Sequence, residues 1–215
     1  MPKSCVTYEL KPPSLAQAFA WIPISNVPSG RPALASDGVD DWMETVALGA
    51  KLNNLSGLSA SLRLNVMPLV SLNKIARILW VESGVADVPR FGYARTNIGG
   101  VDFYADGVTR DTDPVTAMTG GVYEYEGWAT HTMRRDYLNG TERVDYNAGV
   151  KVSAGGIQTI NYGDESESLR LRLGAQSGGQ NAGAFQIYGF RLYTYAITDD
   201  DVQTDSDYYY GLNNA

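Results

Sequence analysis

Hydrophobic and polar residues alternate with a period of two along several short segments of this chain. The clearest case is residues 169–173, where three leucines alternate with Arg170 and Arg172. Such alternation predicts a β-strand with a buried leucine face and a solvated arginine face. Further strands, bounded by Gly, Asn, Asp or Pro, are predicted at residues 62–66, 75–81, 101–104, 122–125 and 185–195. The last of these is apolar on both faces, which predicts a position inside a sheet.

Helical patterns are few. Thr198 followed by three aspartates at residues 199–201 is typical of a helix N-terminus, and we assign these aspartates wholly to capping. This helix is expected to end near Asp205. A second short helix is expected over residues 15–20, and the three tyrosines at 208–210 are interpreted as a packing strap. The pattern as a whole predicts an all-β class.

The first 33 residues differ from the rest of the chain because they contain six of its nine prolines. Proline has no backbone N–H, so this density argues against strands inside a sheet. We therefore divide the chain into an extended N-terminal arm, residues 1–33, and a β domain, residues 34–215. Four apolar side chains are candidate attachment anchors in the arm: Leu15, Phe19, Trp21 and Ile22. The alternative is a strap that packs on its own domain.

Composition narrows the class of partner. The formal net charge of −7 argues against nucleic-acid binding, because such a chain does not neutralise phosphates. No run of about 18 apolar residues is present, which predicts no membrane insertion, and the N-terminus lacks a signal-peptide pattern. Cys5 is the only cysteine and His131 the only histidine. Together they cannot supply the usual ligands of zinc.

Three segments occur in the order found in a known superfamily. They are LASDGVDDW at 34–42, GWATH at 127–131 followed by YLNG at 137–140, and IYGFRLYTYAITDDDV at 187–202. They resemble the laminin-G-like members of the concanavalin A-like lectin/glucanase superfamily, although Ser36 stands where that family usually has Phe. The resemblance implies a jelly-roll sandwich of two stacked antiparallel sheets, with the first and last strands as neighbours.

The residues support this fold independently. The dipeptides at 37–38 and 139–140 are Asp-Gly and Asn-Gly, which favour tight turns. Arg191 lies in an apolar strand and therefore needs a carboxylate partner. Tryptophans are bulky enough to fill the space between two sheets. The predicted core comprises Trp42, Leu64, Ile78, Trp80, Trp128, Leu171, Phe190 and Leu192.

Catalytic patterns are weak. Retaining glycosidases need two carboxyl groups about 5 Å apart, and the family places them on one strand face. Glu124 and Glu126 would share a strand face, but no Asp stands between them. We interpret them as surface carboxylates and predict no enzymatic activity. His131 lies on a predicted strand and is interpreted as a structural, partly buried residue.

Two kinds of binding site remain open. Calcium prefers hard oxygen ligands, and related domains often hold it at the sheet rim. The candidate ligands are Asp37, Asp40 and Asp41 in one loop, and Asp111 and Asp113 in another. The alternative is that these aspartates close turns through their own backbone. Glycan binding would use exposed aromatic rings, and the candidates are Tyr93, Tyr104, Tyr123, Tyr125 and Tyr146. Tyrosine is also a favourable strand residue, so both interpretations stand.

Two functions are therefore expected, with glycosidase activity third. Laminin-G-like domains are usually exported, whereas this chain shows no signal-peptide pattern. A phage virion protein fits both facts, because it is made in the host cytoplasm and released by lysis. Such a non-catalytic structural protein would decorate a capsid or form part of a tail or fibre. Its arm would bind other virion proteins or sister subunits. The alternative is a carbohydrate-binding module that recognises surface glycans through aromatics at the loop rim.

Overall fold

The computed structural model of this chain describes most of two β-sheets and one helix. Its backbone is described at residues 20–22, 33–46, 55–66, 76–82, 89–95, 101–105, 128–146, 149–155, 170–175 and 183–211. Side chains are described at residues 33–46, 55–65, 128–141, 143, 145, 170–175 and 183–208. Among the helices so described, none has the length and apolar character needed to cross a membrane.

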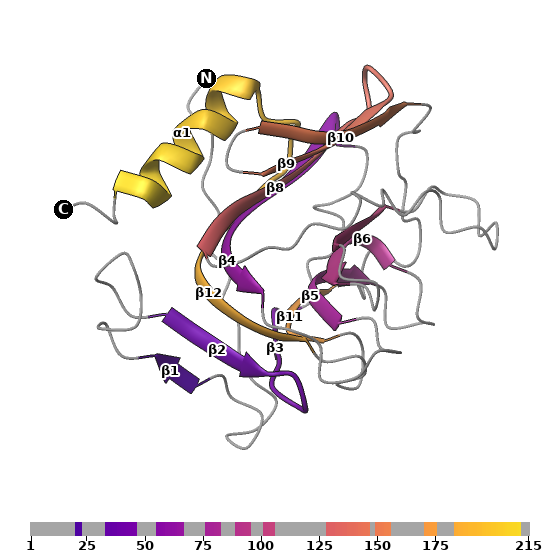
Figure 1. The fold of residues 1–215 in the computed structure, drawn as a ribbon. Helices are drawn as coiled ribbons and strands as arrows, with labels where there is room; N and C mark the ends of the chain where they lie inside the picture. The colour runs from indigo at the N-terminus through magenta and orange to yellow at the C-terminus, as the bar shows by residue number, and fades with distance from the viewer. Residues whose placement is uncertain are drawn as a thin grey trace.

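Two antiparallel sheets form the framework (Figure 1). The seven-stranded sheet runs in the order β1 (Ala20–Ile22), β2 (Ala33–Asp37), β12 (Ala184–Tyr193), β4 (Gly57–Val66), β8 (Trp128–Asp136), β9 (Thr141–Tyr146) and β10 (Gly149–Gly155). The five-stranded sheet runs in the order β3 (Met43–Glu44), β11 (Arg170–Leu173), β5 (Ala76–Glu82), β6 (Pro89–Arg95) and β7 (Val101–Ala105). The predicted all-β class with two antiparallel sheets is confirmed. The prediction that the first and last strands of the domain are neighbours is also confirmed, because β12 pairs with β2, the strand that contains residue 34.

Most of the predicted strands are present. Residues 62–66, 75–81 and 101–104 correspond to β4, β5 and β7, with β5 beginning at Ala76. The strand that is apolar on both faces corresponds to β12, which lies between β2 and β4 in the sheet interior. The predicted strand at 122–125 lies outside the described residues.

The core is centred on β4 and β8. Along β4, Leu58, Leu62 and Leu64 are fully buried, and the strand register places Leu62 opposite His131 of β8. Of the predicted core, Trp42, Leu64 and Leu171 are buried, whereas Trp128, Phe190 and Leu192 are only partly buried. The side chains of Ile78 and Trp80 lie outside the described residues.

The second face of the β4–β8 pair is also buried, although its residues are polar. Alternation places Ser59, Ser61 and Arg63 on this face of β4, and all three are buried. In Figure 1 the seven-stranded sheet lies between helix α1 (Asp199–Gly211) and the five-stranded sheet, and α1 contacts β4 and β8. A strand covered on both sides has no solvated face, so alternation here separates an apolar layer from a polar one.

The prediction for β11 is also corrected. Arg172 was expected on a solvated face, but it is only 5% exposed. β11 lies between β3 and β5, and the Arg172 Nε lies 3.1 Å from a Glu44 carboxylate oxygen. Its guanidinium also lies 5.9 Å from the centre of the Trp42 ring. This ion pair and ring contact make burial of the charge tolerable, whereas Arg170 stays partly exposed.

Helix α1 is longer than expected. Its N-terminus is capped as predicted, because the Asp201 N–H donates to the Thr198 hydroxyl and the Asp201 carboxylate accepts from the Thr198 N–H. The helix passes the expected end at Asp205, and tyrosines 208–210 belong to it rather than to a strap. The Arg191 guanidinium of β12 lies 4.3 Å from the centre of the Tyr208 ring. The local sequence around Tyr208 does not indicate this contact.

The predicted partner of Arg191 is found on the same helix. Asp205 is buried, and its carboxylate forms an ion pair with Arg191 and accepts a 2.6 Å hydrogen bond from the Tyr193 hydroxyl. The inference that a cation inside an apolar strand needs a carboxylate is confirmed.

Part of the predicted arm belongs to the sheet. β1 pairs with the edge of β2, with Trp21 opposite Leu34. Ala20 is therefore a strand residue, because its backbone pairs with β2. The prediction that a helix extends over residues 15–20 is wrong at this last residue. For these three residues the strap alternative holds. Ala33, the last residue assigned to the arm, is buried and begins β2. The other arm residues lie outside the described part of the chain, and the division into an arm and a domain stays a prediction.

Candidate binding site between the β8–β9 hairpin and helix α1

The β8–β9 hairpin is closed by a turn at residues 137–140. The Asp136 Oδ1 accepts hydrogen bonds of 3.0 Å from the backbone N–H of Leu138 and of Asn139, and its Oδ2 accepts one of 2.6 Å from the Asn139 side chain. Burial opposes ionisation of Asp136, but these three bonds bring the net pKa of its carboxyl below the usual value. Gly140 has a φ of 62°, which confirms the predicted Asn-Gly turn.

A second wall is the segment at residues 196–199, which leads into α1. Ser59 of β4 fixes this segment, because its hydroxyl donates to the Tyr195 carbonyl at 3.1 Å and accepts from the Ile197 N–H at 3.2 Å. Gly57 permits the close approach, since a Cβ there would lie 2.2 Å from the Ala196 nitrogen. The start of the helix is thus tied to the interior of the seven-stranded sheet.

Arg134 of β8 joins the two walls. It is 6% exposed, and its Nε and Nη2 donate to the two oxygens of the buried Asp145 carboxylate at 2.8 and 2.9 Å. Its Nη1 donates to Asp199 Oδ1 at 2.5 Å and to the Ile197 carbonyl at 3.4 Å. The bidentate contact with β9 fixes the guanidinium plane, and the remaining nitrogen holds the first residue of α1.

Asp199 is shared by two arginines. Its Oδ1 also accepts from Arg143 Nη1 at 3.2 Å, while its side chain is 71% exposed. The hydrogen bond and charge of Arg134, and then those of Arg143, lower the pKa of Asp199. The assignment of residues 199–201 wholly to capping is therefore corrected. Thr198 and Asp201 form the cap, and Asp199 forms ion pairs with the sheet.

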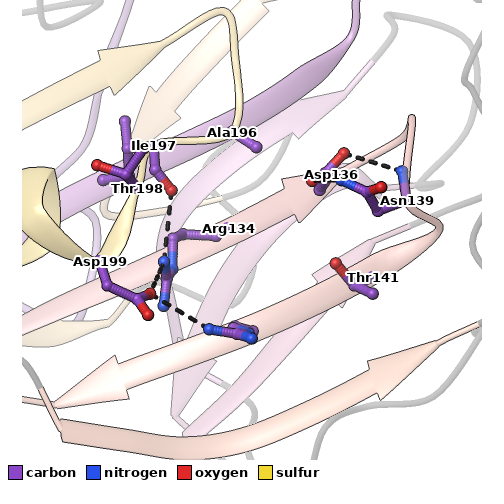
Figure 2. Close-up of a pocket in the computed structure, with 9 residues that line it drawn as sticks. Arg134, Asp136, Asn139, Thr141, Ala196, Ile197, Thr198 and Asp199 are labelled. Atoms are coloured by element: carbon purple, nitrogen blue, oxygen red, sulfur yellow. Dashed lines mark hydrogen bonds and ion pairs between the residues drawn. The ribbon is translucent and has the colours of Figure 1, made fainter.

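A pocket of about 390 Å³ lies between these walls. Figure 2 shows Asp136 and Asn139 on one side and Asp199 on the other, with Arg134 between them. The lining residues are Arg134, Asp136, Asn139, Thr141, Arg143, Ala196, Ile197, Thr198 and Asp199. Polar side chains dominate this lining, and none of the described lining residues is aromatic. The volume falls within the range of about 300–1,000 Å³ that is usual for small-molecule sites.

The aspartate loop after β2 was one of the two predicted calcium sites. Carboxylate oxygens of Asp37, Asp40 and Asp41 lie within 4.8 Å of one another. Asp37 Oδ1 accepts from the Val39 N–H at 2.7 Å, and Asp41 Oδ2 accepts from the Asp37 N–H at 2.9 Å. Burial, opposed by the bond from Asp37 and aided by the charges of Asp37 and Asp40, raises the pKa of Asp41. Two of the aspartates thus close the turn, and calcium binding by the three stays a prediction.

The other predicted sites are only partly described. Asp111, Asp113, Tyr123 and Tyr125 lie outside the described residues, as do Glu124 and Glu126. The backbones of the remaining candidate tyrosines lie in two different sheets, with Tyr93 in β6, Tyr104 in β7 and Tyr146 in β9. Their side chains are not described, so glycan contacts by these tyrosines stay predictions.

His131 is structural, as interpreted from the sequence, and is buried more deeply than expected. It is 1% exposed, and burial, with the charge of Arg63, lowers its pKa to about 3. An imidazole in this state is neutral throughout the physiological range.

Comparisons with known proteins show the fold. No protein-family model matches the chain, and no curated protein matches it. Solved structures do match: the binding domain of botulinum neurotoxin serotype G has a TM-score of 0.61 at 10% identity, covering 94% of this chain and 46% of that one. The shared fold is a β-sandwich of antiparallel sheets. The CBM40 module of Ruminococcus gnavus IT-sialidase has a TM-score of 0.56 at 18% identity, covering 71% of this chain and 83% of the module.

A Trypanosoma rangeli sialidase solved with 2,3-difluorosialic acid also matches, with a TM-score of 0.58 at 13% identity. The match covers 81% of this chain but only 27% of the sialidase. The chain thus spans under half of the matched toxin and sialidase chains, and most of the CBM40 module. At these identities the likeness shows the fold alone.

Proposed function

We propose that this chain is a non-catalytic carbohydrate-binding module. The observation that carries the proposal is the fold shared with the CBM40 module over most of that module's length. The similarity to a toxin binding domain supports a binding role as well. Fold alone does not assign function, so the proposal also needs a site with suitable chemistry.

The hairpin–helix pocket is the proposed site. Sugars present many hydroxyl groups, which both donate and accept hydrogen bonds, and this lining offers both kinds of partner. Arg143 supplies donors, Asp199 supplies an acceptor, and the Thr141 hydroxyl can act as either. At the hairpin tip, Leu138 is 80% exposed and offers an apolar surface to the face of a sugar ring beside these polar groups.

This proposal places the carbohydrate-binding alternative above the virion component. The comparisons support a binding module and give no support to a capsid, tail or fibre role. Virion localisation and attachment through residues 1–33 stay predictions. The similar sialidase region is only a fraction of that enzyme, so no catalytic role is proposed.

A glycan array tests the proposal, using the purified chain with calcium and with EDTA. Thr141→Trp places a large side chain in the pocket from an exposed strand position. Thr204→Trp, at an exposed position of α1 outside the lining, is the matched control. We expect glycan binding by the wild type and by Thr204→Trp, and loss of binding in Thr141→Trp at an unchanged melting temperature. Absence of binding to every glycan, or full binding by Thr141→Trp, would refute the proposal or its site.

A further inference from the structure

The described residues that line the pocket are balanced in charge. It contains two arginines, Arg134 and Arg143, and two carboxylates, Asp136 and Asp199. An anionic ligand needs a cation that is not already neutralised. An anionic ligand could bind here only if one of the two guanidinium groups had an edge whose N–H donors are available to it.

Arg134 has no such edge. Its Nε and Nη2 form the bidentate contact with Asp145, and its Nη1 donates to Asp199 and to the Ile197 carbonyl. A guanidinium has five N–H donors, and four of them are accounted for by these bonds. A ligand carboxylate would have to displace a buried ion pair to reach this residue.

Arg143 is more accessible, with 42% of its side chain exposed, but its Nη1 faces the same Asp199 oxygen. Asp199 thus lies between the two cations, where the carboxylate of an acidic sugar would otherwise bind. Its low pKa, caused first by Arg134, keeps it charged. An approaching anion would meet a like charge there, while a hydroxyl group would find an acceptor.

We propose that this pocket selects neutral glycans over sialylated ones, and that Asp199 is the specificity-determining residue. The inference rests on the proposed carbohydrate-binding function and assigns the ligand class of the same site. It differs from what the similarity to a sialidase bound to a sialic-acid derivative would suggest. Exclusion of a competing ligand by a fixed like charge is a common source of specificity.

The test compares one oligosaccharide with and without terminal sialic acid, by calorimetry on the full chain. We expect the wild type to bind the neutral form at least about tenfold more tightly, because like charges at an interface disfavour the wrong partner. That affinity should not change between about 50 and 500 mM NaCl, since no ligand charge is screened. Asp199→Asn removes the negative charge that lies between the two arginines and should gain about tenfold in affinity for the sialylated form, with a strong salt dependence.

Asp207→Asn is the matched control, because Asp207 is an exposed aspartate of the same helix outside the pocket. It should behave as the wild type. A wild-type preference for the sialylated form, lost in Thr141→Trp, would overturn this inference and leave carbohydrate binding intact. Binding of no glycan at all would refute the proposed function and the inference together. An unchanged preference in folded Asp199→Asn would refute the role of Asp199, and the wild-type preference tests the ligand class even where that variant is unstable.

Discussion

The burial of His131 leads us to expect that the free energy of unfolding decreases at mildly acidic pH. It is the only histidine of the chain, and burial with the nearby charge of Arg63 lowers its pKa to about 3 in the folded protein. In the unfolded chain an imidazole has a pKa of about 6.5. No other side-chain type has an ordinary pKa between about 5 and 7, so His131 is expected to dominate the pH dependence of stability in this window.

The sign follows from proton binding. Below pH 6.5 the unfolded chain takes up a proton that the folded protein does not, so folding stability falls as pH decreases toward the folded pKa. His131 should cost about 2 kcal/mol at pH 5 relative to pH 7.5, at roughly 1.4 kcal/mol for each pH unit below 6.5. Such a loss is a large part of the usual net stability of about 5–15 kcal/mol. Burial raises the pKa of Asp41 and of Asp145, so these carboxylates act in the opposite direction as pH falls.

Urea denaturation at half-unit steps from pH 7.5 to 5 measures this loss. The comparison is His131→Gln, which has no titrating group and keeps Asp41 and Asp145 unchanged. Its stability is lower at every pH because the core is altered, but its dependence on pH over this window should be flat or slightly reversed. The reasoning is refuted if the wild type loses no stability between pH 7 and 5, or if His131→Gln loses as much.

Four further predictions follow from other contacts. Deletion of residues 1–33 removes β1 from the edge of β2 and should lower the melting temperature in calorimetry, whereas an unchanged melting temperature with lost assembly would favour an attachment arm. Asp40→Asn should leave the melting temperature unchanged or slightly raised without calcium, because the turn bonds come from other residues and the charge of Asp40 repels that of Asp41. A calcium-induced rise in the wild type that this variant abolishes would identify a metal site, and no rise would leave these aspartates as turn formers. Asp205→Asn weakens the ion pair and hydrogen bond to β12 and should cost about 2 kcal/mol by urea denaturation, and a neutral result would contradict this. Glu124→Gln and Glu126→Gln should change stability by no more than about 0.5 kcal/mol. Reducing-sugar assays on β-glucans should detect no hydrolysis by the wild type, and hydrolysis that either variant abolishes would contradict this.

The sequence predicts the fold better than the site because the strands of the fold follow from local patterns of hydrophobic and polar residues. Period-two alternation locates β4 and β12, and the burial cost of one arginine predicts its carboxylate partner, found at Asp205. Alternation does not tell which polar face stays wet, because that depends on what covers the strand. Arg172, for example, is buried beside Glu44 and the Trp42 ring.

The pocket depends on contacts between distant parts of the chain. Arg134 and Asp199 are 65 positions apart, and nothing in the local sequence of either indicates the other. Asp199 also stands in a run that helix capping explains on its own, which hides its second role. The only signal is the arginines on either side of the predicted Asn-Gly turn, which precede the aspartates of the capped helix start in the sequence, and it does not specify a pairing.

The hydrogen bonds that hold both pocket walls have a consequence for binding thermodynamics. Ser59 holds the backbone that leads into α1, and Asp136 holds the hairpin turn. A ligand entering this pocket would find its partners already in place, so little conformational entropy would be lost on binding. The free and bound forms should then have nearly superimposable backbones around the pocket, and association should proceed close to the rate set by rigid-body encounter.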